Sequence, residues 1–547
     1  MGCYQSKFIV VFMKKSLFCC YFLIILLMVF SNNLFATSFQ SRPNIIFIMT
    51  DDHTKQAMSA YGSSLIETPN LDRIANEGIR FDKSFVTNAI CSPSRAVALT
   101  GKYSHINGVK DNRDVFDGEQ QTLQMLLQSA GYETSMIGKW HLKSKPTGFD
   151  VWNILPGQGA YYNPEFITDK GTVKHHGYVT ELITDFALET IAQRDKSKPF
   201  AMMYFHKAPH RNWMPDIEDL GAFNNIDFPL PDTFFDDYQG RSVAVKNQDM
   251  RIADMYSSFD MKLHVDKETN TGGNASWDAL SEWKTVYNGM TKGQRRAWDN
   301  AYESDNKKFN DAKLTGVELA IWKYQRYIRD YLLTVKSVDD NVGRLLKYLD
   351  KSGLSNNTIV VYTSDQGFYL GEHGWFDKRF MYEESFGMPL AIRYPKMIKA
   401  GLVSDDLVMN LDLAPTLLDL AGVKIPEDMQ GLSLKGIMQN GRLDTKRTAG
   451  EWRDSVYYHY YEYPHGWHSV NRHRGVRTDR YKLIHYYDIK EWELYDLDID
   501  PNELNNIYAD KKQYSTVLLL TNELANLRAL YGDVTDHTDQ KTNQIAI

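Results

Sequence analysis

Short runs of apolar residues recur along the chain, and each run ends in polar, ionisable side chains. A continuous apolar run of five or six residues is typical of a strand buried on both faces of a parallel sheet. Stretches with helical spacing separate the runs, at about 122–129 and 317–349. This alternation predicts a doubly wound α/β domain, in which ligands bind beyond the carboxyl ends of the strands. The four clearest strand candidates are Ile45–Met49, Tyr132–Ile137, Phe200–Phe205 and Thr358–Thr363.

A different pattern begins near residue 426. Short tyrosine-rich runs follow one another between 456 and 495, and a helical pattern then extends from about Tyr514 to Tyr531. These features predict a smaller α+β domain, in which an antiparallel sheet is backed by a helix. The polar, weakly periodic stretch 213–315 predicts helices and loops over one side of the first domain. We therefore expect a main domain over 41–435 and a C-terminal subdomain over 436–547.

The first 36 residues have the pattern of a signal peptide. Two lysines precede an apolar run from Leu17 to Phe30, and Leu34–Ala36 offers a small-residue cleavage end. The run is too short to favour a membrane-spanning helix. Met1 and Met13 both remain open as the true start. We expect an exported, soluble protein, periplasmic or secreted, without stable membrane insertion.

Charge argues against one class of partner. The chain carries 62 basic and 69 acidic side chains, for a formal net charge of −7. Removal of the first 36 residues takes away three lysines and no acid, so the remaining chain has a net charge of −10. Proteins that bind nucleic acid usually have a basic surplus. Nucleic acid is therefore not expected as a partner.

Cys91 is the one cysteine outside the predicted signal peptide. A single thiol in an exported protein is unusual. It is open whether this thiol is a small buried apolar group or a nucleophile of lowered pKa, as in cysteine hydrolases. Ser92 and Pro93 are favourable residues for the start of a helix. Residue 91 would then face the exposed amides of a helix N-terminus, where anions bind readily.

The motif that begins at Cys91 is Cys-x-Pro-Ser-Arg followed by Leu-Thr-Gly. It strongly resembles the signature of the formylglycine-dependent sulfatases, and the resemblance extends from Asn44 to about Tyr508. It implies an alkaline-phosphatase-like fold with a mixed sheet, a C-terminal subdomain that closes over the active site, and hydrolysis of sulfate esters. It also implies that Cys91 is oxidised to formylglycine (3-oxoalanine) by a formylglycine-generating enzyme or an anaerobic sulfatase-maturating enzyme.

Oxygen-bearing side chains follow two of the predicted strands, Asp51 and Asp52 after the first and Asp365 and Gln366 after the last. Hard cations such as calcium prefer all-oxygen ligand sets, whereas zinc prefers histidine and cysteine. The resemblance implies that these four residues, with matured Cys91, bind one Ca²⁺. Relatives often have asparagine in place of Gln366. If Asp51 and Asp52 only capped a helix, the second, distant pair would be unexplained.

The resemblance also assigns roles to basic residues. Lys139 and Lys378 would stabilise negative charge on the sulfuryl oxygens together with calcium, and Arg95 would hold the formylglycine by hydrogen bonds. His210 would protonate the leaving alcohol, and His141 would help to expel sulfate from residue 91.

The loops around these motifs are similar to those of bacterial polysaccharide sulfatases, particularly the N-acetylglucosamine-6-sulfatase type. We expect a sulfated carbohydrate as substrate, either 6-sulfated glucosamine of the heparan type or an algal polysaccharide such as ulvan. The residues expected to contact the sugar are Arg211, Asn212, His373, Asp377, Arg379, His468 and His473.

Two other functions remain open at this point. A phosphomonoester or phosphonate hydrolase of the alkaline phosphatase superfamily would share the sheet and the aspartates, but its two-zinc members need further histidine and aspartate ligands. A catalytically inactive sugar-binding protein would be expected to have lost Cys91, Arg95, Lys139 or His210, and the chain has all four.

Overall fold

The computed structural model describes residues 42–268, 277–441 and 452–534. From Pro43 onward the chain forms one compact unit. The predicted signal peptide lies outside the described residues. Within the described ranges, no helix combines the length and the apolar character that a membrane crossing requires.

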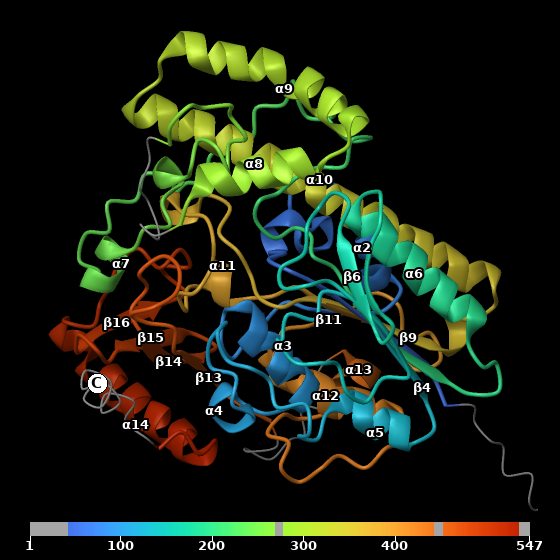
Figure 1. The fold of residues 1–547 in the computed structure, drawn as a ribbon. Helices are drawn as coiled ribbons and strands as arrows, with labels where there is room; N and C mark the ends of the chain where they lie inside the picture. Colours follow the sequence, from blue (N-terminus) through green and yellow to red (C-terminus); the bar gives the residue numbers. More distant parts are fainter. Residues whose placement is uncertain (1–41, 269–276, 442–451, 535–547) are drawn as a thin grey trace, which may run out of the picture. The chain divides into compact units, whose positions relative to one another are not determined.

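A ten-stranded mixed sheet forms the centre of this unit (Figure 1). In spatial order its strands are β11 (Leu402–Ser404), β2 (Ile79–Phe81), β10 (Leu390–Arg393), β9 (Thr358–Ser364), β1 (Asn44–Thr50), β8 (Phe200–Phe205), β4 (Glu133–Gly138), β5 (Val151–Ile154), β6 (Glu165–Thr168) and β7 (Gly171–Lys174). Strands β9, β1, β8, β4 and β5 run parallel to one another. Strand β10 pairs antiparallel with β9, and β6 pairs antiparallel with β5.

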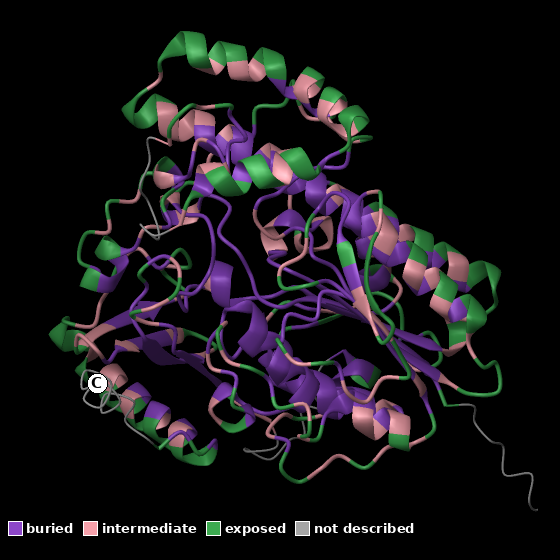
Figure 2. Cartoon of the chain, viewed as in Figure 1, coloured by how far each residue is buried: buried purple, intermediate pink, exposed green. Residues whose placement is uncertain are grey.

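Helices cover both faces of the sheet because successive side chains of a strand point to opposite sides. In β1, Phe47 joins one hydrophobic cluster and Ile46 joins another, and both side chains are fully buried. Figure 2 shows the buried strands as a continuous layer between helices with exposed outer faces. The first cluster includes residues of α3 (Cys91–Thr100), α5 (Leu123–Ser129) and α12 (Leu413–Leu420), and the second includes residues of α2 (Pro69–Asn76), α6 (Val179–Gln193) and α10 (Gly316–Lys351).

A smaller antiparallel sheet follows in the C-terminal part of the chain. Its strands are β13 (Ser455–Tyr460), β14 (His473–Thr478), β15 (Tyr481–Tyr486) and β16 (Glu491–Asp496), in that spatial order. Helix α14 (Tyr514–Leu530) packs against this sheet. Two further helices, α8 (Ala279–Gly289) and α9 (Lys292–Ala312), lie over one side of the main sheet (Figure 1). The other α-helices and strands are short: α4 (Ser104–Asn107), α7 (Val243–Asn247), α11 (Glu383–Phe386), α13 (Lys435–Asn440), β3 (Ser84–Phe85) and β12 (Val408–Met409).

The predicted architecture is confirmed in outline. All four predicted apolar strands are present, and each boundary differs by no more than one residue. The doubly wound mixed sheet and the smaller antiparallel sheet with its helix are also present. The domain boundaries at 435 and 436 remain predictions. Helix α3 begins at Cys91 itself, earlier than Ser92 and Pro93 suggested.

The four predicted strands are neighbours in the order β9-β1-β8-β4. Because they are parallel, their carboxyl ends meet at one edge of the sheet, and the residues that follow them converge there. Gly138 shows how tightly this edge is built. Its φ is +105°, and a Cβ at this position would lie 1.9 Å from the carbonyl oxygen of Phe205. At this last position of β4, only glycine fits without displacing the backbone of β8.

Gly138→Ala is therefore expected to lower the free energy of unfolding by at least about 2 kcal/mol, because it combines a strained φ with a backbone clash. Gly131→Ala is the matched control, since its φ is +90° but no atom lies within 4 Å of the added Cβ. Its cost should be about 1 kcal/mol, from the strained φ alone. Urea unfolding followed by fluorescence measures both. Equal costs for the two variants would contradict the close packing of β4 against β8.

Candidate active site

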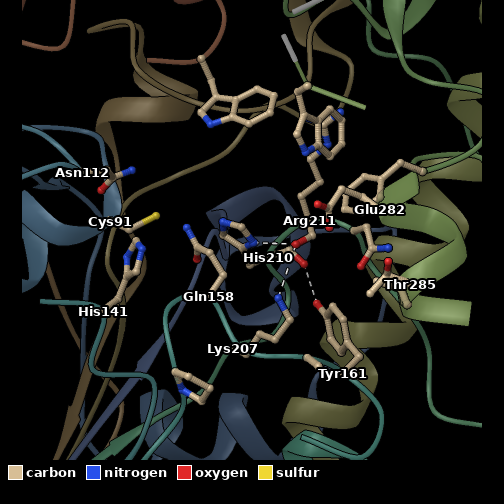
Figure 3. A pocket seen from close by; sticks show the side chains of 18 of the residues that line it. Cys91, Asn112, His141, Gln158, Tyr161, Lys207, His210, Arg211, Glu282 and Thr285 are labelled. Carbon is tan, nitrogen blue, oxygen red and sulfur yellow. Dashed lines mark hydrogen bonds between the residues drawn. The ribbon is translucent and has the colours of Figure 1, made fainter. Parts of the chain in front are cut away.

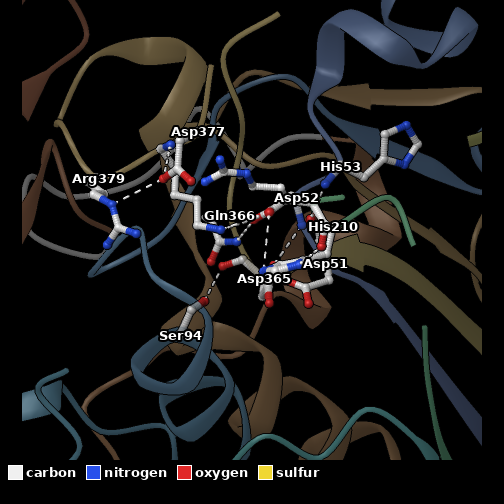
Figure 4. Close-up of polar contacts among 12 residues, drawn as sticks. Asp51, Asp52, His53, Ser94, His210, Asp365, Gln366, Asp377 and Arg379 are labelled. Carbon is white, nitrogen blue, oxygen red and sulfur yellow. Dashed lines mark hydrogen bonds and ion pairs between the residues drawn. The ribbon is translucent and has the colours of Figure 1, made fainter. Parts of the chain in front are cut away.

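Three buried carboxylates meet where β1 and β9 end (Figure 4). Asp51 and Asp52 directly follow β1, and Asp365 directly follows β9. Each of the three places an oxygen within 4.8 Å of the others, and all are inaccessible to solvent. Gln366 donates to the Asp52 Oδ1 over 2.5 Å. The site therefore concentrates negative charge in the protein interior, which requires compensation.

The geometry at these residues fits a hard cation. The Oδ1 of Asp51 and the Oε1 of Gln366 have no hydrogen-bond donor within the described part of the chain, although both are buried. Buried oxygens without donors are rare in folded proteins unless an ion or water satisfies them. Asp51, Asp52, Asp365 and Gln366 supply an all-oxygen set of the kind that calcium prefers. Cys91 also lies within reach, grouped with Asp51 and His210.

Cys91 is the first residue of α3, and its side chain is buried at the base of the site. Burial raises the pKa of the Cys91 thiol to about 12. The unmodified thiol therefore stays protonated at neutral pH, which argues against a thiolate nucleophile. One helical turn further, Arg95 donates to the Asp365 Oδ2 at 2.9 Å and to the carbonyl of Lys139 at 2.7 Å. It fixes the start of α3 to the ends of β9 and β4.

The predicted lysines pair with the carboxylates. Lys139, directly after β4, forms an ion pair with Asp51, and both side chains are fully buried. Lys378 donates to both oxygens of Asp52, at 2.7 and 2.8 Å. His141 contacts the Ser92 hydroxyl through its Nδ1 at 3.2 Å. These residues lie together as the sequence motifs suggested.

The orientation of His210 is fixed by a backbone contact. Its Nδ1 lies 2.6 Å from the carbonyl oxygen of Arg211. A carbonyl oxygen can only accept, so Nδ1 carries a proton and Nε2 is left facing Asp52, 3.9 Å from its Oδ2. Burial, followed by the charges of Lys139, Lys378 and Lys207, lowers the pKa of His210 well below its ordinary value. Nε2 is thus a hydrogen-bond acceptor until an anion enters.

A pocket of about 860 Å³ opens beside these groups (Figure 3). It is lined by Cys91, His141, His210 and Lys378, whereas Arg95 and Lys139 are buried and do not line it. Five of the seven residues predicted to contact sugar also line it: Arg211, Asn212, Asp377, Arg379 and His468. This volume accommodates more than one sugar ring, since ligand pockets of this size hold drug-sized molecules.

The part of the pocket that is lined by Asp377, Arg379 and His468 contains a network of ion pairs. Asp377 lies 3.1 Å from the Arg379 Nε and 3.3 Å from the His468 Nε2, and Arg379 also donates to Glu462 at 2.6 Å. Asp377, Arg379 and His468 have φ values of 76°, 100° and 72°. Such strained backbones persist where surrounding contacts fix them, and they cluster at functional sites. Glu462 and His468 come from the C-terminal part of the chain, which therefore completes the pocket.

Two of the predicted sugar contacts are corrected by the structure. His373 and His473 are fully buried and do not line the pocket. The Nδ1 of His373 lies 2.9 Å from Asp236, and the ring of His473 stacks among Phe380 and Tyr458. Burial lowers the pKa of His473 to about 4. Both histidines are interior packing residues. The loop after β9 directs His373 away from the cavity, and β14 does the same for His473.

Several residues of the pocket were not predicted from the sequence. Lys207 lies three residues before His210, to which the sequence assigned a role, so its position was a usable signal. The others lie in segments without a motif, and only the fold brings them to the pocket. They include Asn112, Gln158, Trp277, Glu282, Glu462 and Trp467.

The fold and the site together define a hydrolase of anionic esters, with a carboxylate-rich cation site beside a helix N-terminus and a sugar-sized pocket. Two family models match the chain. The sulfatase model covers residues 43–423, and the model of the N-sulphoglucosamine sulphohydrolase C-terminal region covers residues 371–530. The chain belongs to the sulfatase family and is a sulfuric ester hydrolase. The alkaline-phosphatase-like fold class predicted from the sequence is confirmed with it.

Individual sulfatases of known substrate are similar to this chain. The chain is 54% identical over 488 residues to the N-acetylglucosamine-6-O-sulfatase of Bacteroides thetaiotaomicron, covering 88% of this chain and 86% of that protein. It is 28% identical over 449 residues to the human N-acetylglucosamine-6-sulfatase, covering 77% and 67%. A solved structure of a protein in complex with its substrate D-glucosamine-2-N,6-O-disulfate matches with a TM-score of 0.86 and 53% identity, covering 92% of this chain and all of that one.

The ion pair between His468 and Asp377 should make stability depend on pH. Burial would lower the pKa of His468, but Asp377 and Asp249 outweigh it, and the pKa is raised above the ordinary value of 6.5. A raised folded-state pKa gives stability that is complete below the unfolded pKa and is lost as pH rises through the folded pKa. His468→Gln should therefore cost more unfolding free energy near pH 6 than near pH 9.

His473→Gln is the matched control for this measurement. Because the pKa of His473 is lowered to about 4, its neutral form is favoured in the folded protein, and the pH dependence has the opposite sign. The cost of His473→Gln should be no greater near pH 6 than near pH 9. A cost of His468→Gln that does not change between these two pH values would contradict the ion pair.

Proposed function

We propose that this sulfatase removes the 6-O-sulfate from glucosamine residues of sulfated glycans. The observation that carries the proposal is the 54% identity to an N-acetylglucosamine-6-O-sulfatase over most of both chains. The structural match to a complex with a 6-O-sulfated glucosamine supports the same sugar. The pocket is consistent with it, because polar and charged groups surround a cavity large enough for a glycan end.

Maturation of Cys91 to formylglycine and binding of one calcium ion belong to this proposal. With both in place, the site gains an aldehyde hydrate as nucleophile and a hard cation that withdraws charge from the sulfuryl oxygens. Asp51, Asp52, Asp365 and Gln366 would hold the ion. A formylglycine-generating or anaerobic sulfatase-maturating enzyme would act on the unfolded chain, because Cys91 is buried once α3 is packed.

Residues of the chain would have separate roles in the hydrolysis of the sulfate ester. Lys378, on the pocket wall, offers its ammonium to the sulfuryl oxygens, and Lys139 adds positive charge from behind the lining. Arg95 keeps residue 91 in place through Asp365. A sulfate anion beside His210 raises the pKa of its imidazole, so that Nε2 can carry a proton to the leaving sugar oxygen. His141, held by Ser92, can accept a proton when sulfate is expelled from residue 91.

The competing functions are less well supported. A phosphate or phosphonate hydrolase with two zinc ions would need a histidine-rich second site. Among the described residues the candidate metal clusters centre on one place, near Asp51. For the ulvan alternative, the ulvan-active sulfatase of Formosa agariphila is 24% identical to this chain, against 54% for the N-acetylglucosamine-6-O-sulfatase. Export through the N-terminal signal peptide, to the periplasm or the medium, remains part of the proposal.

Cys91→Ala, and Cys91→Ser produced without a maturating enzyme, should each lower sulfate release from 6-O-sulfated N-acetylglucosamine by at least about 1,000-fold, since alanine cannot be oxidised to the aldehyde and an unoxidised serine lacks the second hydroxyl of the aldehyde hydrate. Ion chromatography of free sulfate measures the rate, and mass spectrometry of the peptide around residue 91 confirms formylglycine in the parent protein. The two variants should retain the parent's thermal midpoint. Undiminished release by Cys91→Ala would overturn the mechanism, and no release by the matured parent would overturn the assigned sugar.

Calcium removal should destabilise the protein, because it takes a divalent cation away from three buried carboxylates that share a few ion-pair partners. Calcium at 100 times its dissociation constant would stabilise the folded state by about 2.7 kcal/mol. We expect a higher thermal midpoint in calcium than in EDTA, and no such difference for Asp365→Asn. Identical midpoints of the parent protein in calcium and EDTA would contradict a calcium site here.

A further inference from the structure

Four lysine and arginine side chains on the pocket lining are buried or, in the case of Arg211, largely buried, and three of them have carboxylate partners. Lys378 binds Asp52, Arg211 binds Asp260 through two contacts of 2.7 Å, and Arg379 binds Asp377 and Glu462. A buried charge that is paired in this way is already compensated before any ligand arrives. The fourth is Lys207.

Lys207 has no carboxylate within 4.0 Å in the described part of the chain. It follows β8, and its side chain is only 3% exposed. Its ammonium lies 3.5 Å from the carbonyl oxygen of Arg211 and 4.6 Å from the centroid of the Tyr161 ring. Figure 3 shows it pointing toward the His210–Arg211 segment from beside Tyr161. These are weak partners for a buried ammonium, which is costly to leave without an anion.

Lys207 lines the same pocket as Cys91, His210 and Lys378. Burial lowers the pKa of Lys207, and the nearby Asp52 carboxylate opposes that shift. Lys207 also contributes to the fields at Lys139 and His210. Lys139 and Lys378 each pair with an aspartate, whereas Lys207 has no aspartate partner among the described residues. An anion that enters beside Cys91 would supply the missing partner.

We propose that Lys207 is a further sulfate-binding residue, which contacts the sulfuryl oxygens of the substrate and of the sulfate product. This inference rests on the proposed function in one respect, that the anion at Cys91 is a sulfate. Burial lowers the pKa of Lys207 to about 7, and a sulfate beside it would raise that pKa and keep the ammonium charged.

The test measures the affinity of the matured, calcium-loaded protein for inorganic sulfate and, separately, for desulfated N-acetylglucosamine, by calorimetry. Lys207→Met should weaken sulfate binding by about 10- to 100-fold, the effect of losing one charge-assisted hydrogen bond. Lys207→Arg should keep sulfate affinity within about threefold, because it keeps the charge. The affinity for the desulfated sugar should not change in either variant.

Lys323→Met is the matched control for the loss of a buried lysine. Lys323 also binds only backbone carbonyls, those of Ala253 and Met255 at 2.7 Å, and it lies outside the pocket lining. It should leave sulfate affinity unchanged. If Lys207→Met does not fold, Lys207→Gln replaces it, with the thermal midpoint as the check of folding.

The possible results separate cleanly. Unchanged sulfate affinity in Lys207→Met overturns the inference, and so does a loss of sugar affinity without a loss of sulfate affinity. Equal losses for sulfate and sugar would make Lys207 a structural support of the Arg211 carbonyl and also overturn it. If the parent protein binds sulfate through Lys207 but releases none from 6-O-sulfated glucosamine, the proposed substrate fails while the inference stands.

Discussion

The site depends on one constraint: three aspartates end two neighbouring parallel strands in the protein interior. Asp51, Asp52 and Asp365 cannot remain charged there without cations close by. The fold supplies them from separate elements, since Lys139 follows β4, Arg95 lies in α3, and Lys378 comes from the loop after β9. The calcium ion that we propose for this all-oxygen cluster would complete the balance. The catalytic geometry is thus a consequence of how buried charge is neutralised at one edge of the sheet.

In the proposed function, chemistry and sugar recognition are divided between the two parts of the fold. The carboxylates and His210 follow strands of the large sheet, and Cys91 is the first residue of α3. The sugar side depends on the C-terminal part, where Glu462 holds Arg379 and His468 holds Asp377. The Tyr458 hydroxyl also donates to the carbonyl of Arg379 at 2.5 Å. Changes in these contacts could therefore alter the sugar while leaving the sulfuryl chemistry intact, as is common for one fold with many substrates.

The sequence was informative wherever chemistry follows directly from a strand. Buried apolar runs marked β1, β4, β8 and β9, and the polar residues after them converge because parallel strands end together. It was less informative for loops. His373 shares a loop with Lys378, but spacing does not determine which side of a loop a side chain takes, and His373 turns to Asp236. Trp277 and Gln158 reach the pocket only through the tertiary fold, which no local pattern encodes.

The most direct test of the account is a competition between two esters of the same sugar. Equal amounts of N-acetylglucosamine 6-sulfate and N-acetylglucosamine 6-phosphate are incubated with the matured, calcium-loaded protein and followed by NMR. Both place an anion on the same oxygen, so the comparison isolates the chemistry of the charged group. The account predicts that the sulfate ester is consumed at least about 100-fold faster, a difference of about 2.7 kcal/mol in transition-state binding. Equal or faster loss of the phosphate ester would contradict it.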